Sequence, residues 1–206
     1  METEVILVRH GETEWNRELK FQGSQDVELS VKGKEQAKNL AIRFASKKID
    51  KIYSSNLNRA YQTASLVAEK HKLEVVQVDG LEEINFGEWE GKTYQEINEQ
   101  FDFTVEQWMK DPVSKRPPAG ESLKELEERS IKAFKKILEE ERGKKIVIAS
   151  HGGVIRVLLC NLLQIPLSNS WRLKQSNTAV NILKFYEGDE SVVLELLNCS
   201  LHLEMK

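Results

Sequence analysis

The sequence contains few cysteines and no long apolar run. Its 206 residues include only two cysteines, Cys160 and Cys199. Because two cysteines cannot form the disulfide framework of a small secreted protein, we expect both to be reduced thiols. No apolar stretch reaches the roughly 18 residues that span a bilayer, and acidic residues interrupt the N-terminus. We therefore expect a soluble, cytoplasmic protein that has no membrane partner.

Charge of one sign is not in excess either. The chain has 30 Lys and Arg against 33 Asp and Glu, which gives a formal net charge of -3. A nucleic-acid-binding surface needs clustered positive charge, so we expect no nucleic acid partner. If the protein binds an anion, a few local side chains must provide the positive charge. The length suits a single domain over 1–206.

What the sequence does contain is an alternation of strand and helix patterns. Four apolar, β-branched runs have the length of buried strands and lie at 5–11, 49–54, 73–78 and 144–153. Apolar residues at helical spacing occupy segments between and after them, at 30–44, 56–71, 122–143 and 154–166. This alternation predicts an α/β fold, a three-layer sandwich in which helices cover both faces of a mostly parallel sheet. Two further runs, 179–186 and 191–197, flank the segment EGDE at 187–190 and predict an edge hairpin.

The segment from about 80 to 121 breaks this alternation with aromatic residues, short helical patterns and a Pro- and Gly-rich turn. We expect it to be a capping insertion of helices and loops over the C-terminal ends of the strands. Within it, Phe103 and Trp108 either line a hydrophobic ligand pocket or cover the end of the sheet. We interpret Lys115 and Arg116 as part of a solvated basic loop and do not count them among the candidate functional residues.

Two of the four histidines follow predicted strands directly. His10 follows the run VILVR, His151 follows the run IVIAS, and a glycine comes after each. Open α/β sheets bind ligands at the carboxyl ends of their strands, so the two rings are expected to meet in one site. A single histidine at a strand end is more often structural than catalytic, but the repeated pattern favours catalysis.

Two arginines accompany these histidines. Arg9 precedes His10, and Arg59 lies at the start of the helix that follows the second predicted strand. A guanidinium is always charged and its planar fork matches phosphate oxygens, so the four side chains predict a site for a phosphate dianion. The positive charges oppose protonation of His10, whose neutral ring then has a lone pair that can attack phosphorus. The alternative for Arg59 is an ordinary surface arginine.

Four short motifs, in this order, carry a resemblance to a known family. They are RHGETEWN at 9–16, FQG at 21–23, RAYQTA at 59–64 and SHGG at 150–153. By these motifs the chain resembles the histidine phosphatase superfamily, also called phosphoglycerate-mutase-like, along nearly its whole length. Because the four motifs also fall at the expected ends of strands and helices, the resemblance is specific.

The resemblance implies a role for each motif residue. His10 becomes the phosphohistidine, and Arg9, Arg59 and His151 bind the phosphate. The residues placed around that phosphate are Asn16, Gln22 and Gly152, the last through its backbone N–H. The family needs no metal and no other cofactor.

The resemblance also implies a carboxylate that protonates the leaving group from within the insertion. The family pattern Glu-x-x-x-Gly-x-x-Glu-Gly aligns with Glu83, Gly87, Glu90 and Gly91. This alignment selects Glu83 as the general acid. Glu82 is the competing residue if the register of the loop differs by one, and an exposed loop acid without a catalytic role is the third interpretation.

The same segment favours hydrolysis over phosphate transfer. Mutases of the family are longer and more basic here and read Glu-Arg-x-Tyr-Gly, whereas this chain reads EINFG at 83–87. We therefore expect a phosphomonoesterase that acts on a small phosphorylated metabolite. Resemblance in two runs, NFGEWEG and PPAGES, favours the α-ribazole-5′-phosphate phosphatases of cobalamin synthesis. A broad-specificity phosphatase, a phosphoserine phosphatase and a phosphoglycerate mutase are the alternatives within the family.

Two alternatives come from other functional classes. A metal-dependent hydrolase could use His10, His151 and acidic partners as ligands, but the adjacent arginines would repel the cation. A non-catalytic phosphate-binding module is disfavoured, because the chain has the full set of His10, Arg59, Glu83 and His151. The sequence leaves a homodimer open.

Overall fold

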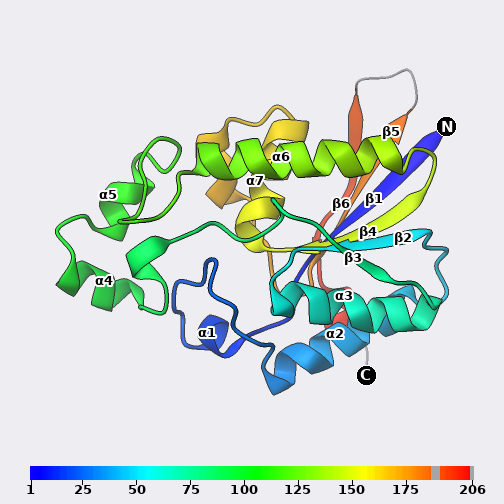
Figure 1. Ribbon diagram of the computed structural model, residues 1–206, viewed down its shortest axis with the longest axis horizontal. Helices are drawn as coiled ribbons and strands as arrows, with labels where there is room; N and C mark the ends of the chain where they lie inside the picture. The colour runs from blue at the N-terminus through cyan, green and yellow to red at the C-terminus, as the bar shows by residue number, and fades with distance from the viewer. Residues whose placement is uncertain (187–190, 205–206) are drawn as a thin grey trace.

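The computed structural model of this protein describes residues 1–186 and 191–204 (Figure 1). In these residues a six-stranded sheet forms the centre, with the strand order β3-β2-β4-β1-β5-β6. Its strands are β1 (Glu2–Arg9), β2 (Lys51–Ser54), β3 (Val75–Gln77), β4 (Lys145–Ser150), β5 (Val180–Tyr186) and β6 (Val192–Cys199). The first four pair in parallel, whereas β5 and β6 pair antiparallel. The predicted turn at 187–190 lies outside the described residues.

Helices cover both faces of the sheet. Figure 1 shows α2 (Val31–Phe44) and α3 (Asn58–His71) on one side, and α6 (Leu123–Glu140) and α7 (Gly152–Leu162) on the other. Side chains of β1 alternate between two cores, because successive residues of a strand point to opposite faces. Ile6 and Val8 pack with residues of α2 and α3, whereas Val5 and Leu7 pack with residues of α6 and α7. The predicted three-layer α/β fold is confirmed.

Local hydrogen bonds set the ends of the elements. The helix α2 begins after Ser30, whose side-chain oxygen accepts from the Gly33 N–H at 3.0 Å. The strand β1 begins at Glu2, earlier than the apolar run predicted, because its polar first residues still pair with β5. The helix α7 begins at Gly152 rather than at 154, so part of the predicted loop belongs to the first helical turn.

The insertion contains three short helices, η1 (Gly87–Trp89), α4 (Tyr94–Gln100) and α5 (Val105–Met109). Figure 1 shows α4 and α5 beyond the end of the sheet at which α1 (Glu14–Arg17) lies. Trp108 is buried there, with its ring centroid 5.6 to 6.0 Å from those of Phe86, Trp89 and Trp171. Phe103 stacks on Trp89 at 5.9 Å. Phe103 and Trp108 therefore cover the end of the sheet as parts of an aromatic cluster.

The two cysteines are free thiols. Cys160 is buried in α7, and Cys199 is half-buried and accepts a hydrogen bond from Arg43 Nη2 at 3.3 Å. Among the helices of the described ranges, none is long and apolar enough to cross a membrane.

Candidate active site

The two histidines at the strand ends lie side by side. In the parallel pair of β1 and β4, Arg9 is opposite Ser150, so the next residues, His10 and His151, meet at the same edge of the sheet. Their ring centroids are 5.2 Å apart, and both side chains are buried. Parallel pairing thus brings both predicted histidines into one site.

One hydrogen bond sets the tautomer of His10. Its Nδ1 lies 2.6 Å from the carbonyl oxygen of Gly11, and since a carbonyl can only accept, Nδ1 carries the proton and donates it. The lone pair is then on Nε2. Burial, followed by the charges of Arg59 and Arg9, holds the pKa of His10 well below its usual 6.5, so the ring is neutral at physiological pH. Gly11 itself has no room for a side chain, because a Cβ would lie 2.5 Å from the Gly33 carbonyl oxygen.

The guanidinium groups of Arg9 and Arg59 are both fixed by backbone carbonyls. Arg9 Nη1 donates to the carbonyl oxygen of Gln175 at 2.7 Å. Arg59 donates to the carbonyl oxygens of Gln25 and Gly23 at 2.7 and 2.6 Å. Burial lowers the pKa of each arginine to about 10, which leaves both charged at neutral pH.

Four buried nitrogens of this site have no hydrogen-bond partner in the described part of the chain. They are Nε of Arg9, Nε of Arg59, Nδ1 of His151 and Nε2 of Gln22. His151 contacts the Ser55 hydroxyl through Nε2 at 2.9 Å, and burial, Arg59 and His10 keep its pKa well below 6.5. Because buried polar groups are nearly always hydrogen-bonded, this concentration of free nitrogens fits a site built for an anion.

Asn16 and Gln22 form a network at the start of α1. Gln22 Oε1 accepts from Thr13 Oγ1 at 2.7 Å and from Asn16 Nδ2 at 3.0 Å, which leaves the Gln22 amide nitrogen as the free end. Asn16 Oδ1 in turn accepts from Asn177 Nδ2 at 3.0 Å, so protein groups engage both ends of the Asn16 amide. Gly152 is the first residue of α7, where backbone N–H groups have no acceptor within the helix.

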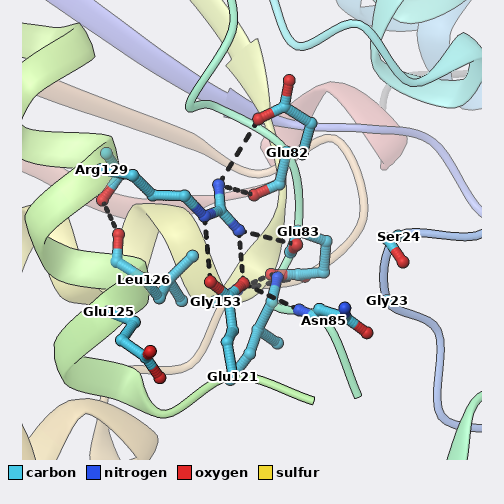
Figure 2. Close-up of polar contacts among 12 residues, drawn as sticks. Gly23, Ser24, Glu82, Glu83, Asn85, Glu121, Glu125, Leu126, Arg129 and Gly153 are labelled. Carbon is cyan, nitrogen blue, oxygen red and sulfur yellow. Dashed lines mark hydrogen bonds and ion pairs between the residues drawn. The ribbon is translucent and has the colours of Figure 1, made fainter. Parts of the chain in front are cut away.

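The two adjacent glutamates of the insertion have different surroundings (Figure 2). The Glu83 carboxylate accepts from the Gly153 N–H at 3.0 and 3.2 Å, at the first turn of α7. The Glu82 carboxylate accepts from the Gly80 N–H at 2.7 Å and lies 3.5 Å from Arg129 Nη1. Glu83 therefore lies at the histidine site, whereas Glu82 is held away from it.

Arg129 of α6 positions this segment, and sequence reasoning missed it. Its Nη1 donates to the Glu82 carbonyl oxygen at 2.8 Å and its Nη2 to the Glu83 carbonyl oxygen at 2.9 Å (Figure 2). Glu121 holds the same guanidinium through both carboxylate oxygens, at 3.1 and 2.5 Å. On an amphipathic helix an isolated arginine has the pattern of a solvated face, so the sequence carried no signal for this contact.

A cavity of about 350 Å³ is lined by Arg9 and Glu83, whereas the buried His10, Arg59 and His151 are not among its lining residues. Its polar lining residues are Arg9, Asn16, Lys20, Gln22, Glu83, Arg156 and Asn177, and its aromatic ones are Phe21, Phe86 and Trp171. Sequence reasoning missed Lys20, Arg156 and Asn177. The position of Arg156, one helical turn after Gly152, was a signal that could have found it, because residues four apart share a helix face. Lys20 and Asn177 lie in segments without a regular period.

The basic residues of the insertion loop lie elsewhere. Arg116 is exposed and pairs with Glu125 at 2.7 Å, and the Lys115 ammonium lies 5.9 Å from the Phe103 ring centroid. Neither lines the cavity. In the described residues, no three His, Cys, Asp or Glu side chains cluster as they would around a metal ion.

Comparison with known proteins identifies the family. A model of the histidine phosphatase superfamily (branch 1) matches residues 5–198. Phosphoserine phosphatase 1 of Hydrogenobacter thermophilus is 37% identical over 203 residues, which cover 97% of this chain and 93% of that protein. A mutant of phosphoserine phosphatase from Entamoeba histolytica, solved in complex with phosphoserine, has a TM-score of 0.86 at 32% identity, and the enzyme in complex with 3-phosphoglyceric acid has a TM-score of 0.86 at 31% identity. Each comparison covers 98% of this chain and 99% of that chain. The α-ribazole phosphatase from Shigella flexneri has a TM-score of 0.87 at 26% identity, with 96% of each chain covered. The chain therefore belongs to the histidine phosphatase superfamily and is a phosphatase of that family.

Proposed function

We propose that this phosphatase hydrolyses a small phosphorylated metabolite through a covalent phosphohistidine on His10. The observation that carries the proposal is the 2.6 Å hydrogen bond from His10 Nδ1 to the Gly11 carbonyl oxygen, which puts the lone pair on Nε2. The charged groups of Arg9 and Arg59 beside the ring supply the positive charge that a phosphoryl group in transfer needs.

In the first step, His10 Nε2 attacks phosphorus and the bond between phosphorus and the ester oxygen breaks. The Glu83 carboxyl group gives its proton to that oxygen, which leaves as an alcohol. Arg9, Arg59 and His151 face the phosphoryl oxygens, and their fixed positions reduce the cost of reorganisation during transfer.

In the second step, the Glu83 carboxylate takes a proton from a water molecule, whose oxygen attacks the phosphorus of phosphohistidine. The bond between Nε2 and phosphorus breaks, phosphate leaves and neutral His10 is restored. The contact of Glu83 with the Gly153 N–H, two residues after His151, supports the assignment of both proton transfers to this one carboxyl group.

Trapping the intermediate tests the proposal. A rapid quench with a ³²P-labelled ester should give a phosphoenzyme that is stable to base and labile to acid, with the label on the peptide that contains His10. His10→Ala should abolish both the label and turnover. His71→Gln, at the far end of α3, is the matched control and should retain both. Near-full hydrolysis by His10→Ala would refute the proposal.

The identity of the alcohol stays a prediction. Similarity to the Shigella flexneri enzyme supports α-ribazole 5′-phosphate, whereas 37% identity to a phosphoserine phosphatase supports an amino acid ester. A panel should contain both substrates, 3-phosphoglycerate and an aryl phosphate. Measuring released phosphate together with 2-phosphoglycerate would separate hydrolysis from a mutase reaction.

A further inference from the structure

Arg156 is a cavity residue that the proposed mechanism does not use. It lies on α7 one turn after Gly152, and its Nε donates to the Leu173 carbonyl oxygen at 2.8 Å. The centre of its guanidinium lies 4.9 Å from the ring centroid of Trp171, within the range of a cation–π contact. These two contacts hold the guanidinium in one orientation at the wall of the cavity.

The outer edge of this guanidinium is free to bind a ligand. In the chain as described, Nη1 and Nη2 of Arg156 have no hydrogen-bond acceptor and no carboxylate within ion-pair distance, and the residue lines the cavity. A Cβ built on Gly152 would lie 2.9 Å from Arg156 Nη1 and 3.5 Å from Arg9 Nε. A Cβ on the next residue, Gly153, would lie 2.4 Å from Glu83 Oε1. The first turn of α7 therefore lies close to three charged groups, the Arg9 guanidinium, the Glu83 carboxyl group and the Arg156 guanidinium.

The other cations of the cavity already have partners. Lys20 forms an ion pair with Glu18 at 2.8 Å, and Arg9 is bound to the Gln175 carbonyl oxygen and faces the phosphate position. Burial lowers the pKa of Arg156, and this effect exceeds the opposite effect of the Glu83 carboxylate, which lies beyond ion-pair distance and raises the pKa. Since a partly buried charge without a partner is unfavourable, an anionic group of the ligand is the natural partner of this guanidinium.

We propose that Arg156 binds a carboxylate on the leaving group, so that the preferred substrates are phosphate esters of hydroxy acids or hydroxy amino acids. The inference rests on the proposed function, because it places the ester oxygen at Glu83. The planar fork of Nη1 and Nη2 matches the two oxygens of a carboxylate. In phosphoserine and in 3-phosphoglycerate, two carbon atoms separate the ester oxygen from the carboxyl carbon, whereas α-ribazole 5′-phosphate has no carboxylate.

Matched substrate pairs test this assignment. Glycerol 3-phosphate differs from 3-phosphoglycerate, and phosphoethanolamine from phosphoserine, by the absence of the carboxylate. For the wild-type protein we expect kcat/KM to be at least about 30-fold higher for the carboxylate member of one or both pairs, as expected for a charge-assisted, two-pronged contact. Arg156→Met should reduce that ratio to within about threefold of unity, and Arg156→Lys should give an intermediate ratio.

The control variant is Arg172→Met, which removes an exposed positive charge from the neighbouring helix η2 (Leu167–Arg172) and should leave the ratio unchanged. Hydrolysis of p-nitrophenyl phosphate and its inhibition by inorganic phosphate report on the phosphate site alone. If Arg156→Met lowered kcat/KM for all esters equally, or weakened inhibition by phosphate to the same degree, Arg156 would belong to the phosphate site and the assignment would be wrong. A wild-type protein that hydrolyses both members of each pair, or α-ribazole 5′-phosphate, equally well would also overturn it. The proposed function would survive either result, because only the His10 experiments bear on the phosphoenzyme.

Discussion

Replacing Glu83 with glutamine should slow phosphoryl transfer to His10 far more from alkyl phosphates than from aryl phosphates. The amide has the same shape and its oxygen can still accept from the Gly153 N–H, now 3.0 Å from Glu83 Oε1, so the loop should keep its position. What the variant loses is the proton that the alkoxide needs. The variant also loses the carboxylate that activates water in the second step, which is common to all esters. The difference between esters is therefore confined to the step in which the leaving group departs.

The size of the effect follows from the role of the proton. General acid catalysis contributes about 10² to 10⁴ in rate, so we expect Glu83→Gln to lower the single-turnover rate of His10 phosphorylation by an alkyl ester about 10³-fold, or about 4 kcal/mol. A nitrophenolate leaves without protonation, so the loss in this step for p-nitrophenyl phosphate should stay below about tenfold, whereas hydrolysis of the phosphohistidine should slow by the same factor for every ester. A series of esters with alcohols of increasing acidity should show a steeper dependence on alcohol pKa in the variant.

Glu82→Gln is the matched control, because the neighbouring carboxylate is bound to the Gly80 N–H and lies near Arg129 instead of at the histidines. It should hydrolyse alkyl and aryl esters almost as the wild type does. Equal losses for alkyl and aryl esters in the single-turnover rate of Glu83→Gln would assign Glu83 a structural role. A leaving-group effect in Glu82→Gln instead would show that the adjacent carboxylate is the proton donor.

Two further predictions concern packing and pH. Gly153→Ala should displace the carboxylate of Glu83, because the new Cβ would lie 2.4 Å from Oε1, and it should therefore lower kcat for alkyl esters. The double variant Gly153→Ala with Glu83→Gln should then be no slower than Glu83→Gln alone. Additive losses of the two substitutions would contradict this reasoning. Buried His202 should make the protein less stable in acid: Arg43 Nη1 lies 3.2 Å from its Nδ1, and burial and that charge lower its pKa from 6.5 to about 4. Its contribution is complete above pH 6.5 and is lost as the pH falls towards 4, because the unfolded chain binds a proton that the folded protein rejects. The free energy of unfolding, measured with urea at pH 7.5 and at about pH 5, should decrease by about 2 kcal/mol more for the wild type than for His202→Gln. Equal decreases in the two proteins would mean that His202 titrates normally in the fold.

Much of the fold and the centre of the site could be predicted from local patterns. The β-branched run of β1 and the helical spacing of Ala37, Leu40 and Phe44 each specify which side is buried, because a strand and a helix have fixed periods. Two parallel strands that each end in a histidine bring His10 and His151 together for the same reason. The sequence also links Arg59 to these two histidines, because the motif that contains Arg59 occurs in order with the other motifs of the family resemblance.

Interactions between distant segments could not be predicted in this way. Nothing in the pair Glu82 and Glu83 tells which carboxylate reaches the site, because a loop has no period that orients its side chains. Arg129 makes that choice from α6 by binding both carbonyl oxygens. Asn177 likewise reaches Asn16 across 161 positions of sequence.

The sequence by itself therefore determined the layers of the fold, the edge of the sheet that holds the candidate site and the RHG motif of the proposed nucleophile, because each depends on residues that are close in the chain. The tertiary structure decided the tautomer of His10, the orientation of Glu83 and the free guanidinium of Arg156 at the cavity wall. These depend on hydrogen bonds, burial and charges from separate elements, which come together only when helices and loops pack against the carboxyl ends of the strands.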